Sequence, residues 1–277
     1  MVVELLGAGE IRSLASELDL RPTKKLGQNF VIDPNTIRKI VAAAQLSPTD
    51  KVVEIGPGLG SLTLGLLEKV DQLIAIEFDQ KLAVRLASTL KQKAPQKSCQ
   101  ILHADAMNVT QLDFEPDALV ANLPYNISVP VILHFLESFP SISKVLVLVQ
   151  AEVAARLVAG PGSKTYGSPS AKLAWYGKAS AAGVVSRSIF WPVPNVDSAL
   201  VYFQKSSTPL QTSLRAEVFR VIDGAFAQRR KTLRQALSGW AGSPDQAEQI
   251  LVKAGVSPQA RGEDLSIDDF IEVAKQK

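Results

Sequence analysis

The chain has 277 residues, of which 46% are hydrophobic and 21% charged, a balance that excludes a disordered protein and accommodates one sizeable core with a smaller appendage. One cysteine, Cys99, excludes an intramolecular disulfide, and His103 and His134 stand apart from any metal-binding cluster. Because no cluster of Cys and His is evident, we expect a protein without a metal. The net charge of +3 indicates no particular partner by itself. The N-terminus lacks a signal-peptide pattern, and the longest aliphatic run, 145–149, is far shorter than the ~20 residues that span a bilayer. We therefore expect a cytoplasmic protein that is not bound to a membrane.

The first two thirds of the chain alternate between short apolar runs and amphipathic stretches. Asp33 and Pro34 are typical of a helix start, and the spacing predicts a helix over 34–44. Strands are predicted at 51–55, 72–77, 99–103, 117–121 and 144–149. Helices are predicted between them at 61–69, 80–93 and 129–137. This alternation predicts a doubly wound, mostly parallel α/β sheet.

The last third changes character. Segments 178–186 and 198–204 are typical of a hairpin-type pair at the edge of the sheet, and a polar break follows at 205–209. Helical patterns then cover 214–237, 244–254 and 266–275, with Gly and Pro between them. The pattern predicts an α/β domain over 1–205, whose first 20 residues have no evident role, and a small helical domain over 206–277.

A glycine loop follows the first strand of the predicted sheet. Gly56, Gly58 and Gly60 form G-x-G-x-G, whereas the dinucleotide fingerprint would place its third glycine at Ser61. Glu77 ends the second strand, where a carboxylate accepts hydrogen bonds from a ribose diol, and Asp105 follows the third, in reach of an adenine amine. Such groups meet at the carboxyl ends of parallel strands. They favour S-adenosylmethionine over a dinucleotide, and hence a Rossmann-like class I methyltransferase sheet.

The fourth strand ends in Asn122-Leu123-Pro124-Tyr125. This has the form of the Asn-Pro-Pro-Tyr motif of methyltransferases that act on exocyclic amines of bases. The adenine amine is a poor nucleophile because its lone pair is delocalised into the ring. An Asn oxygen and a backbone carbonyl that accept its two N–H bonds free the lone pair for in-line attack on a sulfonium methyl group. Tyr125 is placed to stack on the extruded base.

Together these segments resemble the ribosomal RNA adenine dimethyltransferase family, and within it the small-subunit (16S) branch. The resemblance runs from about Arg21 to Leu265 and includes 25–30, 54–60, 122–128, 156–161, 166–167, 190–198, 226–234 and 261–265. It implies dimethylation of two adjacent adenines in a hairpin loop near the 3′ end of the 16S rRNA, on the small subunit or its precursor. That requires four methyl transfers to each RNA. We expect the protein to act as a monomer.

The resemblance also implies roles for individual residues. The cofactor is expected to contact a set drawn from four segments: Gln28, Asn29, Val31, Gly56, Gly58, Glu77, Asp105 and Asn122. Phe190 is expected to sandwich the target adenine opposite Tyr125, although an aromatic residue before a Pro-x-Pro turn more often lies in the core. Two basic clusters are expected to bind RNA phosphates, the second of them on a helix: Arg21, Lys24 and Lys25, and Arg229, Arg230, Lys231 and Arg234.

Three other functions fit part of the pattern. The sister branch that methylates an adenine of 23S rRNA and confers macrolide resistance shares the cofactor loop and the Asn motif, but segments 156–161 and 226–234 favour the small-subunit branch. DNA adenine methyltransferases usually carry a larger recognition domain than the residues after 205 provide. A non-catalytic rRNA-binding assembly factor would not need Glu77, Asp105 and the Asn motif intact.

Overall fold

The computed structural model describes residues 3–20, 29–123, 127–206, 212–228 and 230–277. The chain forms two compact units. The sheet unit comprises Met1–Ala154 and Ser180–Gln204, and the helical unit comprises Ala155–Ala179 and Lys205–Lys277. Segment Ala155–Ala179, which the sequence-based division assigns to the first domain, thus lies in the helical unit. None of the described helices is long and apolar enough to cross a membrane.

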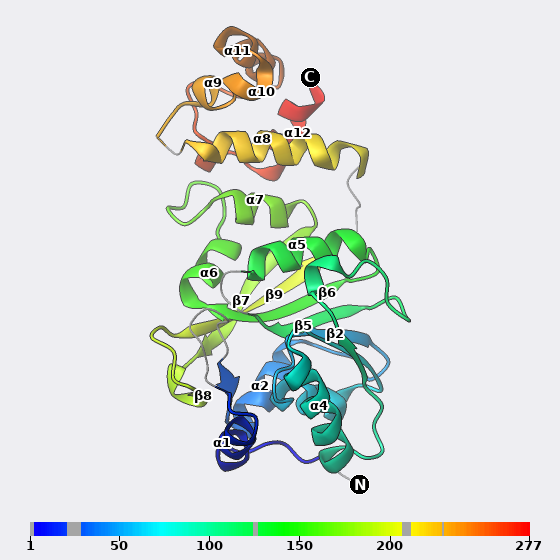
Figure 1. Cartoon of the computed structure of the whole chain (residues 1–277). Coiled ribbons are helices and arrows are strands. Elements are labelled where there is room, and N and C mark those ends of the chain that lie inside the picture. Colours follow the sequence, from blue (N-terminus) through cyan, green and yellow to red (C-terminus); the bar gives the residue numbers. More distant parts are fainter. Residues whose placement is uncertain (1–2, 21–28, 124–126, 207–211, 229) are drawn as a thin grey trace. The chain divides into compact units, whose positions relative to one another are not determined.

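A seven-stranded sheet is the centre of the first unit (Figure 1). Its order is β4-β3-β2-β5-β6-β9-β7, with β2 to β6 parallel and β9 antiparallel to β6. The strands are β2 (Lys51–Ile55), β3 (Gln72–Glu77), β4 (Gln100–His103), β5 (Ala118–Asn122), β6 (Lys144–Gln150), β7 (Gly177–Val185) and β9 (Ser198–Lys205). The chain starts in the middle at β2, runs outward to β4 and returns to β5 beside β2. That reversal is a topological switch point, where open α/β sheets bind ligands.

Helices cover both faces of this sheet: α2 and α4 lie on one side and α5 on the other (Figure 1). The helical elements that lie wholly in the sheet unit are α1 (Ala8–Glu17), α2 (Pro34–Ala43), α3 (Ser61–Lys69), α4 (Gln80–Lys93), η1 (Ala106–Asn108), α5 (Ser128–Ser138) and η2 (Arg187–Ile189). The short strands β1 (Phe30–Val31) and β8 (Phe190–Trp191) form a separate antiparallel pair. The α6 helix (Ala151–Leu157) begins in the sheet unit and ends in the helical unit.

The helical unit is built around α8 (Arg215–Ala227), which packs against α7 (Ser168–Ala174) and α12 (Ile267–Lys275). Its core includes the fully buried Val218, Ile222 and Phe270. Tyr166 donates its hydroxyl hydrogen to the carbonyl oxygen of Leu265 at 2.9 Å, which joins the two parts of the chain that form this unit. Its remaining elements are η3 (Thr212–Leu214), α9 (Leu233–Ala236), α10 (Ser238–Ala241), α11 (Pro244–Lys253) and η4 (Gly262–Asp264).

The predicted doubly wound sheet with a helical unit is confirmed, and the predicted strands deviate from the observed ones by one residue at most. The continuous helix predicted over 214–237 is wrong. The α8 helix ends at Ala227 and α9 begins only at Leu233, because the Leu233 and Arg234 amides donate to the carbonyls of Ala260 and Pro258 at 2.8 and 3.1 Å. These contacts with a distant loop replace the intrahelical bonds that a continuous helix would make.

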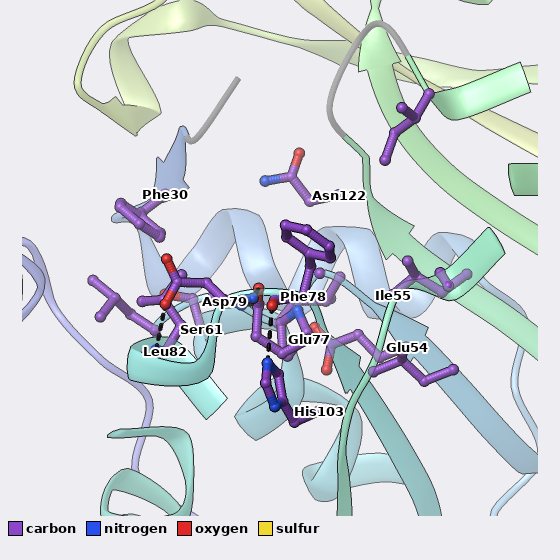
Figure 2. A pocket seen from close by; sticks show the side chains of 18 of the residues that line it. Phe30, Glu54, Ile55, Ser61, Glu77, Phe78, Asp79, Leu82, His103 and Asn122 are labelled. Carbon is purple, nitrogen blue, oxygen red and sulfur yellow. Dashed lines mark hydrogen bonds between the residues drawn. The ribbon is translucent and has the colours of Figure 1, made fainter. Parts of the chain in front are cut away.

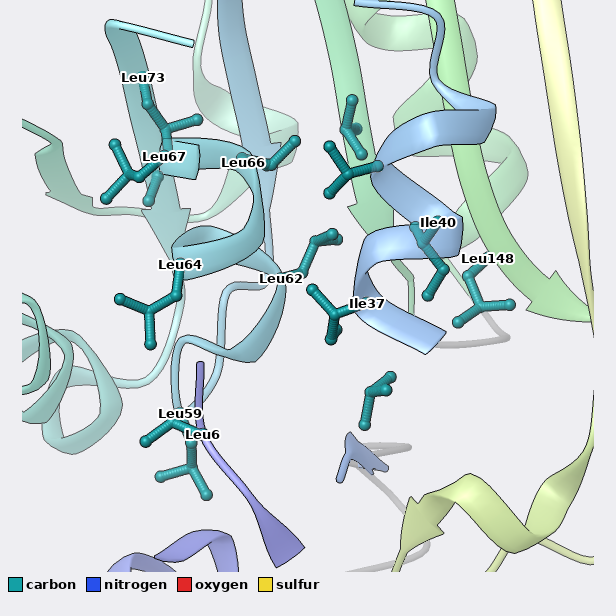
Figure 3. Packing of buried hydrophobic residues seen from close by; sticks show 14 of the residues in the cluster. Leu6, Ile37, Ile40, Leu59, Leu62, Leu64, Leu66, Leu67, Leu73 and Leu148 are labelled. Carbon is teal, nitrogen blue, oxygen red and sulfur yellow. The ribbon is translucent and has the colours of Figure 1, made fainter. Parts of the chain in front are cut away.

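The α2 and α3 helices pack against each other in the core of the sheet unit, on the side of the sheet that carries the glycine loop (Figure 3). Ile37 of α2 points toward Leu62 of α3, whereas Ile40 lies beside Leu148 of β6, and all of these side chains are buried. Gly65 allows this approach. A Cβ atom at Gly65 would overlap the Ile37 Cγ2 atom and lie 3.2 Å from Val41 Cγ2. The two helices therefore pack with no space for a methyl group at that crossing.

We expect Gly65→Ala to lower stability although Ala is the better helix former. Overpacking a close contact costs about 1–3 kcal/mol, which exceeds the gain of about 1 kcal/mol from helix propensity. The test is the free energy of unfolding in urea. Gly9→Ala in α1, where nothing lies within 4 Å of the added carbon, is the matched control and should be neutral or stabilising. Equal effects at both positions would contradict the packing argument.

Candidate active site

A cavity of about 650 Å³ opens at the carboxyl ends of β2, β3, β4 and β5, at the switch point of the sheet (Figure 2). Its volume is in the range of cofactor sites. The glycine loop after β2 forms one wall, and the residues after β3 and β4 form another. Asn122 at the end of β5 and Asn29 next to β1 reach it from a third direction. All of these residues belong to the sheet unit.

The glycine loop has a backbone that other residues rarely adopt. Gly56, Gly58 and Gly60 have φ angles of +69°, +58° and +98°. Space requires glycine as well: a Cβ atom at Gly58 would lie 2.9 Å from the Phe30 ring, and one at Gly60 would lie 2.7 Å from Leu86 Cδ1. The loop thus turns tightly into α3 and exposes its backbone to the cavity.

Glu77 lies at the end of β3 and is only 6% exposed. Its Oε2 accepts the Gly58 amide hydrogen at 3.0 Å, and its Oε1 accepts that of Asp79 at the same distance. Burial raises the pKa of the carboxyl group, while these two N–H donors favour the ionised form. Because a carboxylate oxygen accepts more than one hydrogen bond, Glu77 retains the capacity to bind a vicinal diol in the cavity.

At the cavity, the end of β4 is hydrogen-bonded to the residue that follows β3. His103 Nε2 hydrogen-bonds the carbonyl oxygen of Phe78 at 3.1 Å (Figure 2). Phe78 itself is 66% exposed although it lines the cavity, so its ring is available to a flat ligand. Asp105 caps η1 by accepting the Met107 amide hydrogen at 2.9 Å, and it also lines the cavity. His134, in α5, hydrogen-bonds the carbonyl oxygen of Val109 at 2.8 Å, so both histidines are bound to backbone groups.

Glu54 is the most deeply buried charged residue of the cavity wall, at 1% exposure. Burial, with a smaller contribution from the nearby Glu77 charge, raises the pKa of Glu54 to about 8. Its Oε2 atom has no hydrogen-bond partner among the described residues, nor has the Oγ atom of Ser61, which also lines the cavity. The Thr63 hydroxyl acts on the same carboxyl group and lowers its pKa, against the larger effect of burial.

Asn122 is oriented by the N-terminal part of the chain. Its Nδ2 atom donates to the carbonyl oxygen of Asn29 at 3.0 Å. Because a carbonyl oxygen only accepts, this bond assigns the amide orientation and leaves Oδ1 as the acceptor. Asn29 precedes β1, which is held by its pairing with β8, where Val31 lies opposite Phe190. The Asn29 carbonyl that orients Asn122 is therefore next to a strand whose position is fixed by its pairing with β8.

Most of the predicted cofactor residues meet in this cavity. Asn29, Val31, Gly56, Gly58, Glu77, Asp105 and Asn122 all line it. Gln28, Pro124 and Tyr125 lie outside the described residues. The lining also includes residues that the sequence analysis did not single out, namely Glu54, Ser61, Phe78, Met107 and Ile127. Glu54 could have been found from the sequence, because it is an acidic residue two positions before the first glycine of the loop.

Two other predicted catalytic residues have buried side chains and are not among the residues that line the cavity. Leu123 is 2% exposed, and its amide donates to the carbonyl oxygen of Leu148 at 3.1 Å, as a continuation of the sheet. Phe190 is 1% exposed, belongs to the hydrophobic core cluster and lies opposite Val31 in the β1–β8 pair. Its stacking on the target adenine stays a prediction.

The basic residues that the structure describes do not form one cluster. Arg230 and Lys231 are exposed in the connection between α8 and α9, not on a helix as predicted. Arg234 is bound to the carboxylates of Glu248 and Asp245 at 2.6 and 2.7 Å, which disfavours its predicted contact with phosphate. The other predicted RNA contacts, Arg21, Lys24, Lys25 and Arg229, lie outside the described residues.

No group of His, Cys, Asp and Glu in the described part of the chain is arranged to hold a metal ion. The lining of the cavity contains four carboxylates and neither Lys nor Arg among its described residues. The carboxylates belong to Glu54, Glu77, Asp79 and Asp105. An acidic cavity of this kind disfavours a pyrophosphate and favours a ligand with positive charge.

Solved structures with the same architecture include methyltransferases of RNA. A dimethyladenosine transferase from Plasmodium falciparum has a TM-score of 0.73 at 23% identity and matches 87% of this chain and 94% of its own. The 23S rRNA methyltransferase ErmE has a TM-score of 0.67 at 25% identity over 90% of this chain and 99% of its own. These structures share the class I methyltransferase fold with the protein.

Sequence comparison identifies the family. The ribosomal RNA small subunit methyltransferase A of Streptomyces coelicolor is 56% identical over 99% of this chain and 97% of its own. The protein of the same name from Thermobifida fusca is 55% identical over 99% of this chain and 96% of its own. The model of the family described as ribosomal RNA adenine dimethylase matches residues 20–277. This chain belongs to the ribosomal RNA adenine dimethylase family.

Proposed function

We propose that the protein transfers methyl groups from S-adenosylmethionine to the N6 amines of two adjacent adenines near the 3′ end of 16S rRNA. The product is N6,N6-dimethyladenine in a hairpin loop of the small subunit or its precursor. The observation that supports this proposal best is the position of Asn122, whose amide faces the same cavity as Glu77 and Asp105. The relatives named for the small ribosomal subunit, at 55 and 56% identity, support the choice of 16S rRNA.

The cavity fits this cofactor in shape and in charge. Glu77 would accept hydrogen bonds from the ribose hydroxyls, and Asp105 would accept one from the adenine amine, with the Phe78 ring against the base. Glu54 and Ser61, which also line the cavity, would lie near the polar methionyl end. The lack of Lys and Arg in the described lining suits a sulfonium, which carries a positive charge.

The cofactor supplies an electrophilic methyl group, and the chain supplies placement and hydrogen-bond acceptors. Asn122 Oδ1 would accept one N–H bond of the adenine amine, and the lone pair of that nitrogen would then be directed at the methyl carbon. The bond from Nδ2 to the Asn29 carbonyl keeps Oδ1 from exchanging places with Nδ2. A flipped amide would present a donor to the amine and would lose this interaction.

Recognition of the RNA would combine phosphate contacts with the extruded base. Arg230 and Lys231 are exposed and suited to phosphate oxygens, which position the RNA without reading its sequence. The adenine itself would be recognised in the cavity after leaving its stack. We expect the protein to work as a cytoplasmic monomer without a metal ion.

The proposal is tested by methyl transfer from labelled S-adenosylmethionine to undermethylated 30S particles, with 50S particles and duplex DNA as alternative substrates. Primer extension then maps the label, because it stops at dimethyladenine. We expect label at two adjacent adenines near the 3′ end of 16S rRNA. Label in 23S rRNA would assign the protein the activity named for ErmE. Binding of 30S particles without any label would indicate an assembly factor that does not methylate.

Asn122→Ala should reduce transfer by at least 100-fold, the order of magnitude that follows from removing one preorganised transition-state hydrogen bond. The affinity for S-adenosylmethionine and for 30S particles should change much less. Single-turnover rates and equilibrium binding measured on the same preparations separate the two effects. Near-normal turnover in the variant would remove Asn122 from the mechanism.

The buried acid predicts a pH dependence of stability. Between pH about 4.5 and about 8, folded Glu54 retains a proton that the unfolded chain releases, so this group makes stability fall as pH rises. Glu54→Gln should remove that fall, a difference on the order of a few kcal/mol between pH 5 and 8. Urea unfolding of both proteins across this range measures it. Glu115→Gln, an exposed glutamate outside the cavity, is the control. Parallel curves for wild type and Glu54→Gln would contradict the raised pKa.

A further inference from the structure

We propose that residues 3–20 are a clasp on α4 that sets the affinity for S-adenosylmethionine. This N-terminal clasp includes α1 and lies almost entirely before residue 20, where the family match begins. It lines no part of the cofactor cavity. Its action is therefore a positioning role, exerted through α4. The inference rests on the cofactor site described above.

The clasp is tied to α4 by ion pairs at both ends of α1. Lys93 at the end of α4 binds Glu10 at 2.6 Å and Glu4 at 3.1 Å. Arg85 in the middle of α4 binds Glu17 at 3.2 Å. The order of these partners means that α1 runs antiparallel to α4. The Glu4 amide also donates a hydrogen bond to the Lys93 carbonyl oxygen at 3.0 Å, which attaches the start of the clasp to the end of α4.

Apolar packing completes the attachment. Ile11 and Ala15 of α1 are fully buried, and Leu14 is 7% exposed. They belong to the same core cluster as Leu86 and Leu90 of α4. The clasp thus buries one face of α1 in the core that supports the cofactor domain, and the ion pairs fix its direction along α4.

A displacement of α4 would act on two parts of the cavity wall, Glu77 and the glycine loop. Asp79 caps α4 by accepting the Lys81 and Leu82 amide hydrogens, and its own amide donates to Glu77 Oε1. Leu86, about two turns further along α4, has its Cδ1 atom 2.7 Å from the position that a Cβ of Gly60 would take. A shift of α4 along its axis would therefore displace both the ribose acceptor and the glycine loop.

The route through α4 ends at Glu77, which lines the cofactor cavity. The surface ion pairs of α1 are thus placed to affect cofactor binding and not stability alone.

The test is a charge-swap cycle on the Glu17–Arg85 pair: Glu17→Arg, Arg85→Glu and the double variant. An exposed ion pair is worth up to about 1 kcal/mol, so each single variant should raise the Kd for S-adenosylmethionine about two- to fivefold. The double variant should recover most of the affinity, because the pair is restored with reversed polarity. The matched control is the Lys97–Asp71 pair, which joins other parts of the same unit at 2.6 Å, and its swaps should leave Kd unchanged.

Calorimetric titration of the full chain with S-adenosylmethionine gives Kd in the absence of RNA. The rate of methyl transfer to 30S particles gives kcat, which should change less than twofold. Unchanged Kd with a lowered unfolding temperature in the single variants would overturn the proposal, as would an equal rise in Kd in the control swaps. Should a charge reversal fail to fold, Glu17→Gln applies the same criterion. A wild type that binds the cofactor but leaves 30S particles unlabelled would reject the proposed substrate and leave the clasp testable.

Discussion

The cavity depends on one carboxylate that joins two loops. Glu77 binds the Gly58 amide from the loop after β2 and the Asp79 amide at the start of α4. Two segments far apart in the sequence are thereby held at a fixed separation, with the space for a nucleoside between them. Because the group is almost fully buried, each bond forms in a medium of low dielectric and is stronger than it would be in water.

Glu54, the second buried acid of the cavity wall, lacks the hydrogen bonds that favour ionisation of Glu77. Glu54 has no such pair of amide donors, and its pKa of about 8 means that it is mostly protonated at neutral pH. Burial thus raises the pKa of both acids, and the two amide donors oppose that rise at Glu77.

The sequence was sufficient for those features that local pattern dictates. The apolar runs of β2 and β3 and the helical spacing of α3 and α4 predicted these elements to the residue. The glycine loop, Glu77 and Asp105 were predicted to lie together, and they line one cavity. Features that arise from tertiary contacts were not predictable. The break after α8 depends on hydrogen bonds to the carbonyls of Pro258 and Ala260. The ion pairs of Arg234 depend on two acidic residues of α11. In both cases the partners lie at least ten residues away in the sequence, so local pattern does not reveal them.

The pairing of β1 with β8 has a consequence for the timing of folding. The segment next to Asn122 is braced only when Phe30 lies opposite Trp191, so the two halves of this contact are separated by most of the sheet unit. During synthesis the glycine loop and the first five strands of the sheet leave the ribosome before β8 does. The cavity walls can therefore form early, but the Asn122 amide acquires its fixed orientation only after residue 191 has emerged. A nascent chain shorter than this would have the walls of the cavity without a fixed Asn122.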